Sequence, residues 1–103
     1  MKIVWTGPAL NDLDEMGSFI SQDSPVRAQT FIAEIFESVE KLMDFPHAGR
    51  KFPEIRREDL RELIYEGYRI VYQVIGTQII VLTVAEGHKL LHLKNIRSRR
   101  SGR

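Results

Sequence analysis

The sequence predicts an α+β fold in two layers, in which two helices pack on a twisted antiparallel sheet. Two neighbouring stretches in the first half of the chain place apolar residues three and four positions apart, the period of an amphipathic helix. The second half holds three runs rich in β-branched and aromatic residues, and tight turns separate them. Because short turns force neighbouring strands to run antiparallel, the expected order is strand, helix, helix, strand, strand, strand.

The first half opens with a short strand-like run, Ile3-Val4-Trp5, and continues into two capped helices. Thr6 is a suitable N-cap with Pro8 in the first turn, and Ser24 with Pro25 repeats the arrangement for the second helix. The apolar positions of the two helices are Leu10, Leu13, Gly17 and Ile20, and then Phe31, Ile32, Ile35, Phe36, Val39, Leu42 and Met43. Neither helix is long enough to be stable alone, so their apolar faces are expected to cover the sheet.

The second half begins with a loop from Phe45 to Asp59, in which Pro46 ends the helix before it. The predicted strands are Leu60–Tyr65, Tyr68–Val74 and Gln78–Ala85, with turns at Glu66-Gly67 and Gly76-Thr77. Alternation in the middle strand puts Tyr68, Ile70, Tyr72 and Val74 on one face. The last strand is almost wholly apolar, so we expect it to be covered on both faces.

The composition is that of one globular domain: 103 residues, 43% hydrophobic and 28% charged. The absence of cysteine excludes a disulfide scaffold and any thiolate-bound metal centre. The sequence has neither an apolar run of membrane-spanning length nor a signal-peptide pattern near Met1, so we expect a cytoplasmic protein. We expect a single domain at residues 1–93 and a basic C-terminal tail at residues 94–103.

Charge is unevenly distributed along the chain. Eight acidic and three basic residues lie up to Gly49, whereas twelve basic and six acidic residues follow from Arg50 onward. The tail holds five basic residues and no acidic one: Lys94, Arg97, Arg99, Arg100 and Arg103. The basic half is therefore expected to prefer an anionic partner. The alternative, in which acidic helices simply lie beside a basic sheet and the tail is solvated, stays open.

Basic side chains are the best candidates for a functional site. The candidate cluster consists of Arg50, Lys51, Arg61, Arg69, His88 and Lys89. Metal-free RNA cleavage needs a base, an acid and cations at the phosphate, and His88 or His92 could move protons near neutral pH. The structural alternative is that Arg61 pairs with Glu62 or Glu66 and Arg69 with a helix carboxylate.

Two further interpretations are weaker. His88 and His92 lie four residues apart with Glu86 nearby, a spacing that would suit a metal on a helix, but two surface histidines are the favoured explanation. No metal or other cofactor is expected. Tyr65, Tyr68 and Tyr72 could stack on bases, yet tyrosine at this spacing in a strand is more typical of packing.

The motifs, taken in order, resemble a known superfamily. Residues 45–54, Phe-Pro-His-Ala-Gly-Arg-Lys-Phe-Pro-Glu, are followed by Leu-Arg-Glu-Leu-Ile at 60–64 and Gly-Tyr-Arg-Ile-Val-Tyr at 67–72. This order resembles the RelE/ParE superfamily of toxins from bacterial type II toxin–antitoxin modules, and residues 80–88 are similar to its last strand and the polar motif after it. The likeness covers nearly the whole chain. It implies a toxin of the plasmid-stabilisation type that arrests growth until a cognate antitoxin masks it.

The superfamily has two branches with different targets. RelE-like members cleave mRNA in the ribosomal A site, whereas ParE-like members poison DNA gyrase. Arg69 matches the hairpin arginine of both branches, but Ile64 stands where ribonuclease members place a catalytic arginine. His88-Lys89 occupies the position of a later arginine of the family, which keeps a basic group but loses the bidentate guanidinium. The tyrosine that ribonuclease members carry near the end of the chain has no match here, and only His92 could replace it. The ParE-like branch is favoured, although Ala85 and Glu86 depart from its basic pattern. A RelE-like ribonuclease and an inert binding module of the same fold remain alternatives.

The resemblance and the charge pattern together define the expected site and partners. The expected target-binding residues are Arg50, Lys51, Arg69, His88, Lys89, Lys94 and Arg97. For the ribonuclease alternative the catalytic residues would be Lys51, Arg61, Arg69 and His88. The expected partners are an antitoxin and DNA gyrase, or the ribosome and mRNA in the alternative, and no membrane. An acidic antitoxin segment would bind by strand addition or by packing in a groove. The sequence leaves open whether the chain forms homo-oligomers.

Overall fold

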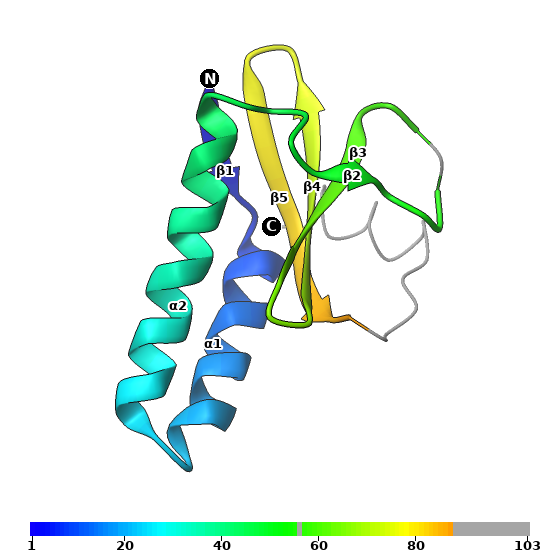
Figure 1. The fold of residues 1–103 in the computed structure, drawn as a ribbon. Coiled ribbons are helices and arrows are strands. Elements are labelled where there is room, and N and C mark those ends of the chain that lie inside the picture. The colour runs from blue at the N-terminus through cyan, green and yellow to red at the C-terminus, as the bar shows by residue number, and fades with distance from the viewer. Residues whose placement is uncertain (56, 88–103) are drawn as a thin grey trace.

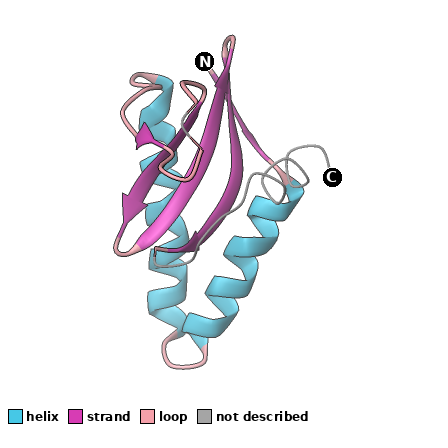
Figure 2. Cartoon of the chain, turned by 90° about the vertical axis from the view of Figure 1, so that its right-hand side faces the viewer, coloured by secondary structure: helices cyan, strands magenta, loops and turns pink. Residues whose placement is uncertain are grey.

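The computed structural model describes residues 1–55 and 57–87, and it confirms the α+β class. The elements are β1 (Lys2–Trp5), α1 (Gly7–Ser21), α2 (Pro25–Glu40), the short 3-10 helix η1 (Lys41–Met43), β2 (Arg50–Lys51), β3 (Leu60–Tyr65), β4 (Tyr68–Ile75) and β5 (Gln78–Glu86). Both helices lie on one side of the sheet (Figure 1). Figure 2 shows the tight α1–α2 connection at the opposite end of the molecule from the N-terminus. The predicted tail, 94–103, lies outside the described residues.

The sheet has the strand order β1-β5-β4-β3-β2. Strands β3, β4 and β5 are antiparallel, as the two tight turns predict. The expectation of a wholly antiparallel sheet is wrong at one edge, where β1 runs parallel to β5. Both helices and strands β2 to β4 separate β1 from β5 in the chain, so no tight turn forces this pair to be antiparallel. Strand β2 lies in the stretch predicted as loop and pairs antiparallel with β3.

Both helices begin at the predicted caps. The Thr6 hydroxyl accepts the Ala9 N–H at 3.2 Å, and the Ser24 hydroxyl accepts the Arg27 N–H at 3.1 Å. Each side chain satisfies a backbone donor that the first helical turn leaves unpaired. Helix α2 ends at Glu40, and η1 tightens the chain before Pro46.

The main core lies between the helices and the sheet. Its buried residues are Ala9, Leu13, Phe31, Ile35, Val39, Leu42, Ile70, Tyr72, Ile79, Val81 and Val84. Gly17 brings the helices close, because a Cβ atom there would lie 2.8 Å from Ile32 Cδ1. Two residues of the predicted apolar stripes, Leu10 and Met43, are instead 45% exposed. The predicted helix faces are otherwise those that pack.

A second, smaller apolar cluster lies on the other face of the sheet. It consists of Phe52, Leu60, Val71 and Leu82, with Ile55 and Ile80 packed against it. Residues 50–55 and 57–59, here called the strap, cover this face, which we call the strap face (Figure 1). The expectation that β5 is covered on both faces is confirmed, and a bulge in the β4–β5 pairing after Val71 lets Val81 and Val84 both reach the main core.

Helix α1 completes the edge of the sheet where β1 stops. Strand β1 pairs with β5 only from Gln78 to Val81. Beyond that point the Asp12 carboxylate accepts the Val84 N–H at 3.0 Å and the Thr83 hydroxyl at 2.8 Å. A side chain of the helix thus replaces a missing strand partner. In the described part of the chain, neither helix has the length and apolarity needed to cross a lipid bilayer.

Candidate functional site

Four of the predicted site cations lie on three neighbouring strands. Arg50 and Lys51 form β2, Arg61 lies in β3 and Arg69 in β4. Residues that pair across an antiparallel ladder share a face, and successive residues alternate. The pairs Arg50↔Glu62 and Lys51↔Arg61 therefore divide the four cations between the two faces at this edge of the sheet. They are brought together, but not as one exposed cationic patch.

Arg69 is buried and held by two carboxylates. Its Nε donates to Glu62 Oε1 at 2.7 Å, while Nη1 and Nη2 donate to the two oxygens of Glu54 at 2.7 and 2.6 Å. Its guanidinium carbon lies 5.2 Å from the centre of the Phe52 ring, and the residue is 5% exposed. Hydrogen bonds from Arg69 to Glu54 and to Glu62 raise the pKa of Arg69 despite its burial. The structural alternative for Arg69 applies, with strap and β3 carboxylates in place of a helix carboxylate.

Glu62 connects this pair to the surface. The Glu62 side chain is fully buried, and its Oε2 accepts from Arg50 Nε and Nη2 at 2.5 Å each. Arg50 is 62% exposed, so it neutralises a buried charge while its side chain still faces solvent. A buried carboxylate needs such partners, because desolvation of an unpaired charge is costly. Arg50 and Arg69 thus share one buried anion.

Lys51 and Arg61 share a second carboxylate, that of Glu58. Lys51 Nζ lies 2.6 Å from Glu58 Oε2, and Arg61 Nη2 lies 3.1 Å from Glu58 Oε1. The hydrogen bond and charge of Lys51 hold the pKa of Glu58 below its usual value, with a smaller effect from Arg61. Glu58 is 73% exposed, so these pairs are screened by solvent.

The glycine of the recognised motif is fixed by close contacts. The Gly49 N–H donates to the buried Tyr72 hydroxyl at 2.9 Å, and that hydroxyl donates to the Pro46 carbonyl at 2.9 Å. Arg61 Nη1 donates to the Gly49 carbonyl at 3.1 Å. A Cβ atom on Gly49 would lie 2.6 Å from both Glu62 O and Tyr72 Oη. Only glycine fits without displacement, which accounts for its place in the motif.

The ion pairs predicted for Arg61 are wrong: its acidic partner among the described residues is Glu58, and Glu62 binds Arg50 and Arg69 instead. Glu66, considered as a partner of Arg61, instead forms an ion pair with Arg27 of α2. No pattern in the sequence points to Glu54, which makes the bidentate contact to Arg69. The contact between Glu62 and Arg69 can be predicted from the sequence. A two-residue turn at Glu66-Gly67 places Arg69 opposite Ile64, and therefore diagonally across the strand pair from Glu62.

The other predicted site residues follow β5 in the sequence. His88, Lys89, Lys94 and Arg97 lie outside the described residues, as does His92. Within residues 1–55 and 57–87, no three His, Cys, Asp or Glu side chains are close enough together to hold a metal ion. Tyr65 and Tyr68 pack against Phe31, so their rings contribute to the main core.

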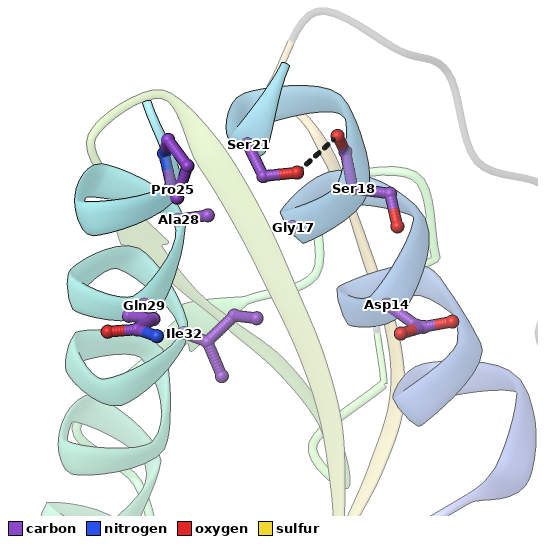
Figure 3. A pocket seen from close by; sticks show the side chains of 8 residues that line it. All are labelled: Asp14, Gly17, Ser18, Ser21, Pro25, Ala28, Gln29 and Ile32. Atoms are coloured by element: carbon purple, nitrogen blue, oxygen red, sulfur yellow. Dashed lines mark hydrogen bonds between the residues drawn. The ribbon is translucent and has the colours of Figure 1, made fainter. Parts of the chain in front are cut away.

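A shallow hollow of about 300 Å³ lies elsewhere, between the two helices. Figure 3 shows the side chains that line it: Asp14, Gly17, Ser18, Ser21, Pro25, Ala28, Gln29 and Ile32. None of the predicted site residues contributes to it.

The fold and the motif network together define a class, the small RelE/ParE-type toxins with two helices on one face of a sheet. The sequence model of the protein family described as "ParE toxin of type II toxin-antitoxin system, parDE" matches residues 3–91 of this chain. The chain belongs to the ParE toxin family and is the toxin of a type II toxin–antitoxin system. Its partner is therefore an antitoxin protein.

Relatives and solved structures agree with this assignment. The chain is 36% identical to putative toxin Y4kP of Sinorhizobium fredii, over 85% of this chain and 90% of the relative. It is 31% identical to toxin RelE2 of Caulobacter vibrioides, over 93% and 92% of the two chains. A structure of the chromosomal ParDE system from P. aeruginosa matches 84% of this chain and 95% of the other, with a TM-score of 0.70 and 25% identity. The RelBE2 complex of Mycobacterium tuberculosis shares the fold, with a TM-score of 0.51, 18% identity and 82% and 95% coverage.

Proposed function

We propose that this toxin arrests growth by binding DNA gyrase in the cytoplasm, and that it is not a ribonuclease. The observation that carries the proposal is the state of Arg69. This arginine is the hairpin cation shared by both branches of the superfamily, and here Glu54 and Glu62 occupy its guanidinium.

Catalysis of RNA cleavage places strict demands on such a cation. Metal-free cleavage develops negative charge on a pentavalent phosphate, and the stabilising cations must be aimed at it before reaction. Arg69 would first have to leave two carboxylates and a buried position. Among the described residues, Lys51 and Arg61 are likewise paired with Glu58, and Ile64 offers no charge. A binding surface has a weaker requirement, since it needs only exposed complementary groups.

Arg50 and Lys51 are the described residues that best fit the proposed contact with gyrase. Their side chains are 62% and 55% exposed, although each is ion-paired. We propose that they act with the basic residues after β5, namely His88, Lys89, Lys94 and Arg97. Arg69 belongs to the expected target-binding group, but its burial supports a different role.

The experiment is a supercoiling assay with purified gyrase and toxin. Wild-type toxin is expected to inhibit supercoiling, and the cognate antitoxin is expected to relieve the inhibition. Arg50→Ala combined with Lys51→Ala should weaken inhibition, whereas Lys41→Ala, which removes an exposed cation from η1, should not. Unaffected supercoiling at toxin concentrations that arrest growth would refute the proposal.

A ribosome-dependent ribonuclease is the second candidate, because a relative at 31% identity is named RelE2. Its catalytic residues would be Lys51, Arg61, Arg69 and His88. Mapping mRNA ends during toxin expression separates the two functions: cuts within translated codons would support the ribonuclease, and an intact pattern would support gyrase binding.

A further inference from the structure

We infer that Arg69, Glu54 and Glu62 form a buried clamp that positions the strap, and that Arg69 contributes to target binding only by holding β2 in place. This inference rests on the proposed function, in which Arg50 and Lys51 of β2 contact the target. It makes Arg69 a positioning residue rather than a contact residue.

The clamp joins three separate elements. Glu54 belongs to the strap, Glu62 to β3 and Arg69 to β4, and their side chains are 15%, 0% and 6% exposed. The bidentate geometry to Glu54 fixes the orientation of the strap as well as its distance. Because the contact is mostly shielded from water, it is stronger than a surface ion pair.

The strap needs this contact because it has little regular structure. Strand β2 contains two residues, and outside the ladder the Phe52 N–H donates to the Leu60 carbonyl at 3.1 Å. So short a strand is not stable by itself. Phe52 is fully buried beneath the guanidinium of Arg69, so the clamp also covers the apolar anchor of the strap. Loss of the clamp would free both the anchor and β2.

Arg50 extends the clamp to the surface. Its guanidinium binds Oε2 of Glu62, while Arg69 binds Oε1 of the same carboxylate. The direction in which Arg50 projects therefore depends on where Arg69 holds Glu62. The two arginines of the expected binding set are thus linked, one buried and one exposed.

The clamp and a direct-contact role for Arg69 predict opposite effects for Glu54→Gln. If Arg69 touched the target, Glu54 would compete for its guanidinium, and Glu54→Gln would strengthen inhibition of gyrase. If Arg69 is a positioning residue, Glu54→Gln removes half of the clamp and weakens inhibition, as Arg69→Gln does. Residues that act as one unit also show non-additive effects.

The test compares Glu54→Gln, Arg69→Gln and the double variant with wild type. Toxin is counted by titration with the cognate antitoxin, so that potency refers to folded molecules. Each single variant should raise the half-inhibitory concentration at least about tenfold, and the double variant should exceed the stronger single by less than about threefold. Glu37→Gln, an exposed carboxylate on α2, is the matched control and should leave potency unchanged.

Hydrogen exchange provides an independent measurement. The amides of Gly49 and Phe52 should lose protection in both single variants, while those of β5 keep theirs. If Arg69→Gln fails to fold, Arg69→Lys replaces it, since lysine keeps the charge but loses the fork. Stronger inhibition by Glu54→Gln, or unchanged exchange at Gly49 and Phe52, would overturn the clamp. If wild-type toxin leaves gyrase unaffected, the proposed function fails, and the exchange measurement still decides whether the clamp exists.

Discussion

The two faces of the sheet are held by different kinds of interaction. The helix face is covered by apolar side chains from α1 and α2, which form one continuous core with the sheet. The strap face has a small apolar cluster surrounded by charged contacts, above all those of Arg69 and Arg57. Regular elements can therefore rely on buried apolar area, whereas an irregular segment needs individual, directed partners.

The motif by which the family is recognised holds the strap and the turn before it in place. Gly49, Arg50, Glu54, Arg61 and Arg69 all make contacts that fix the strap or the turn before it. Their residue types therefore follow from local geometry before any target is considered. The helix side can vary in sequence as long as its apolar spacing is kept.

Truncation in the main core should have the largest effect on stability. Phe31 is 1% exposed and packs against Tyr65 and Tyr68, so Phe31→Ala should lower the free energy of unfolding by about 3–5 kcal/mol. Urea denaturation measures this change. Phe19→Ala is the control, because Phe19 is 70% exposed and its loss should cost less than about 0.5 kcal/mol. Equal effects for the two variants would show that the core is not where the structure places it.

A substitution at Gly49 tests the turn before the strap by overpacking. The added Cβ of Gly49→Ala would lie 2.6 Å from a backbone oxygen and from the Tyr72 hydroxyl, so we expect a loss of about 2–3 kcal/mol. Gly76→Asn is the control, because Gly76 has open space around it and asparagine tolerates its positive φ of 56°. If Gly49→Ala denatures at the same urea concentration as wild type, the close approach is not rigid.

The difference between the two faces also separates what the sequence predicts from what it does not. Apolar spacing predicts both helices and the three long strands, because burial of a regular face leaves a periodic pattern. The parallel pairing of β1 and the two residues of β2 leave no such pattern, since each depends on where distant segments meet. Basic side chains stand out in the sequence by their type, but the carboxylates that bind them do not. The contact between Glu54 and Arg69 joins an irregular segment to a strand, and no spacing rule specifies it.

A smaller loss is expected from Tyr72→Phe, which keeps the ring in the core and removes one hydroxyl. The Gly49 N–H would lose its acceptor and the Pro46 carbonyl its donor, so stability should fall by about 1–2 kcal/mol. Tyr68→Phe is the matched control, since its hydroxyl makes no hydrogen bond within the described part of the chain. A similar loss for both variants would mean that the contacts of the Tyr72 hydroxyl with the turn before the strap are not stabilising.

The smallest predicted effect depends on pH and lies at the end of the strap. Burial alone would raise the pKa of Asp59, but hydrogen bonds from Arg57 and Gln73 outweigh it and hold the pKa below its ordinary value of 3.8. A carboxylate with a lowered pKa in the folded state stabilises fully above pH 3.8 and loses this contribution as the pH falls below that value. Asp59→Asn should therefore lower the free energy of unfolding by about 0.5–1 kcal/mol at pH 7, because the Arg57 pair is partly screened.

The gap in free energy of unfolding between Asp59→Asn and wild type should narrow as the pH falls from 3.8 towards 2. Urea denaturation across this range measures the gap. Arg57→Gln removes the same ion pair from the other side and should show the same pH window. A gap that stays constant down to pH 2 would mean that the ionised carboxylate of Asp59 does not hold the strap.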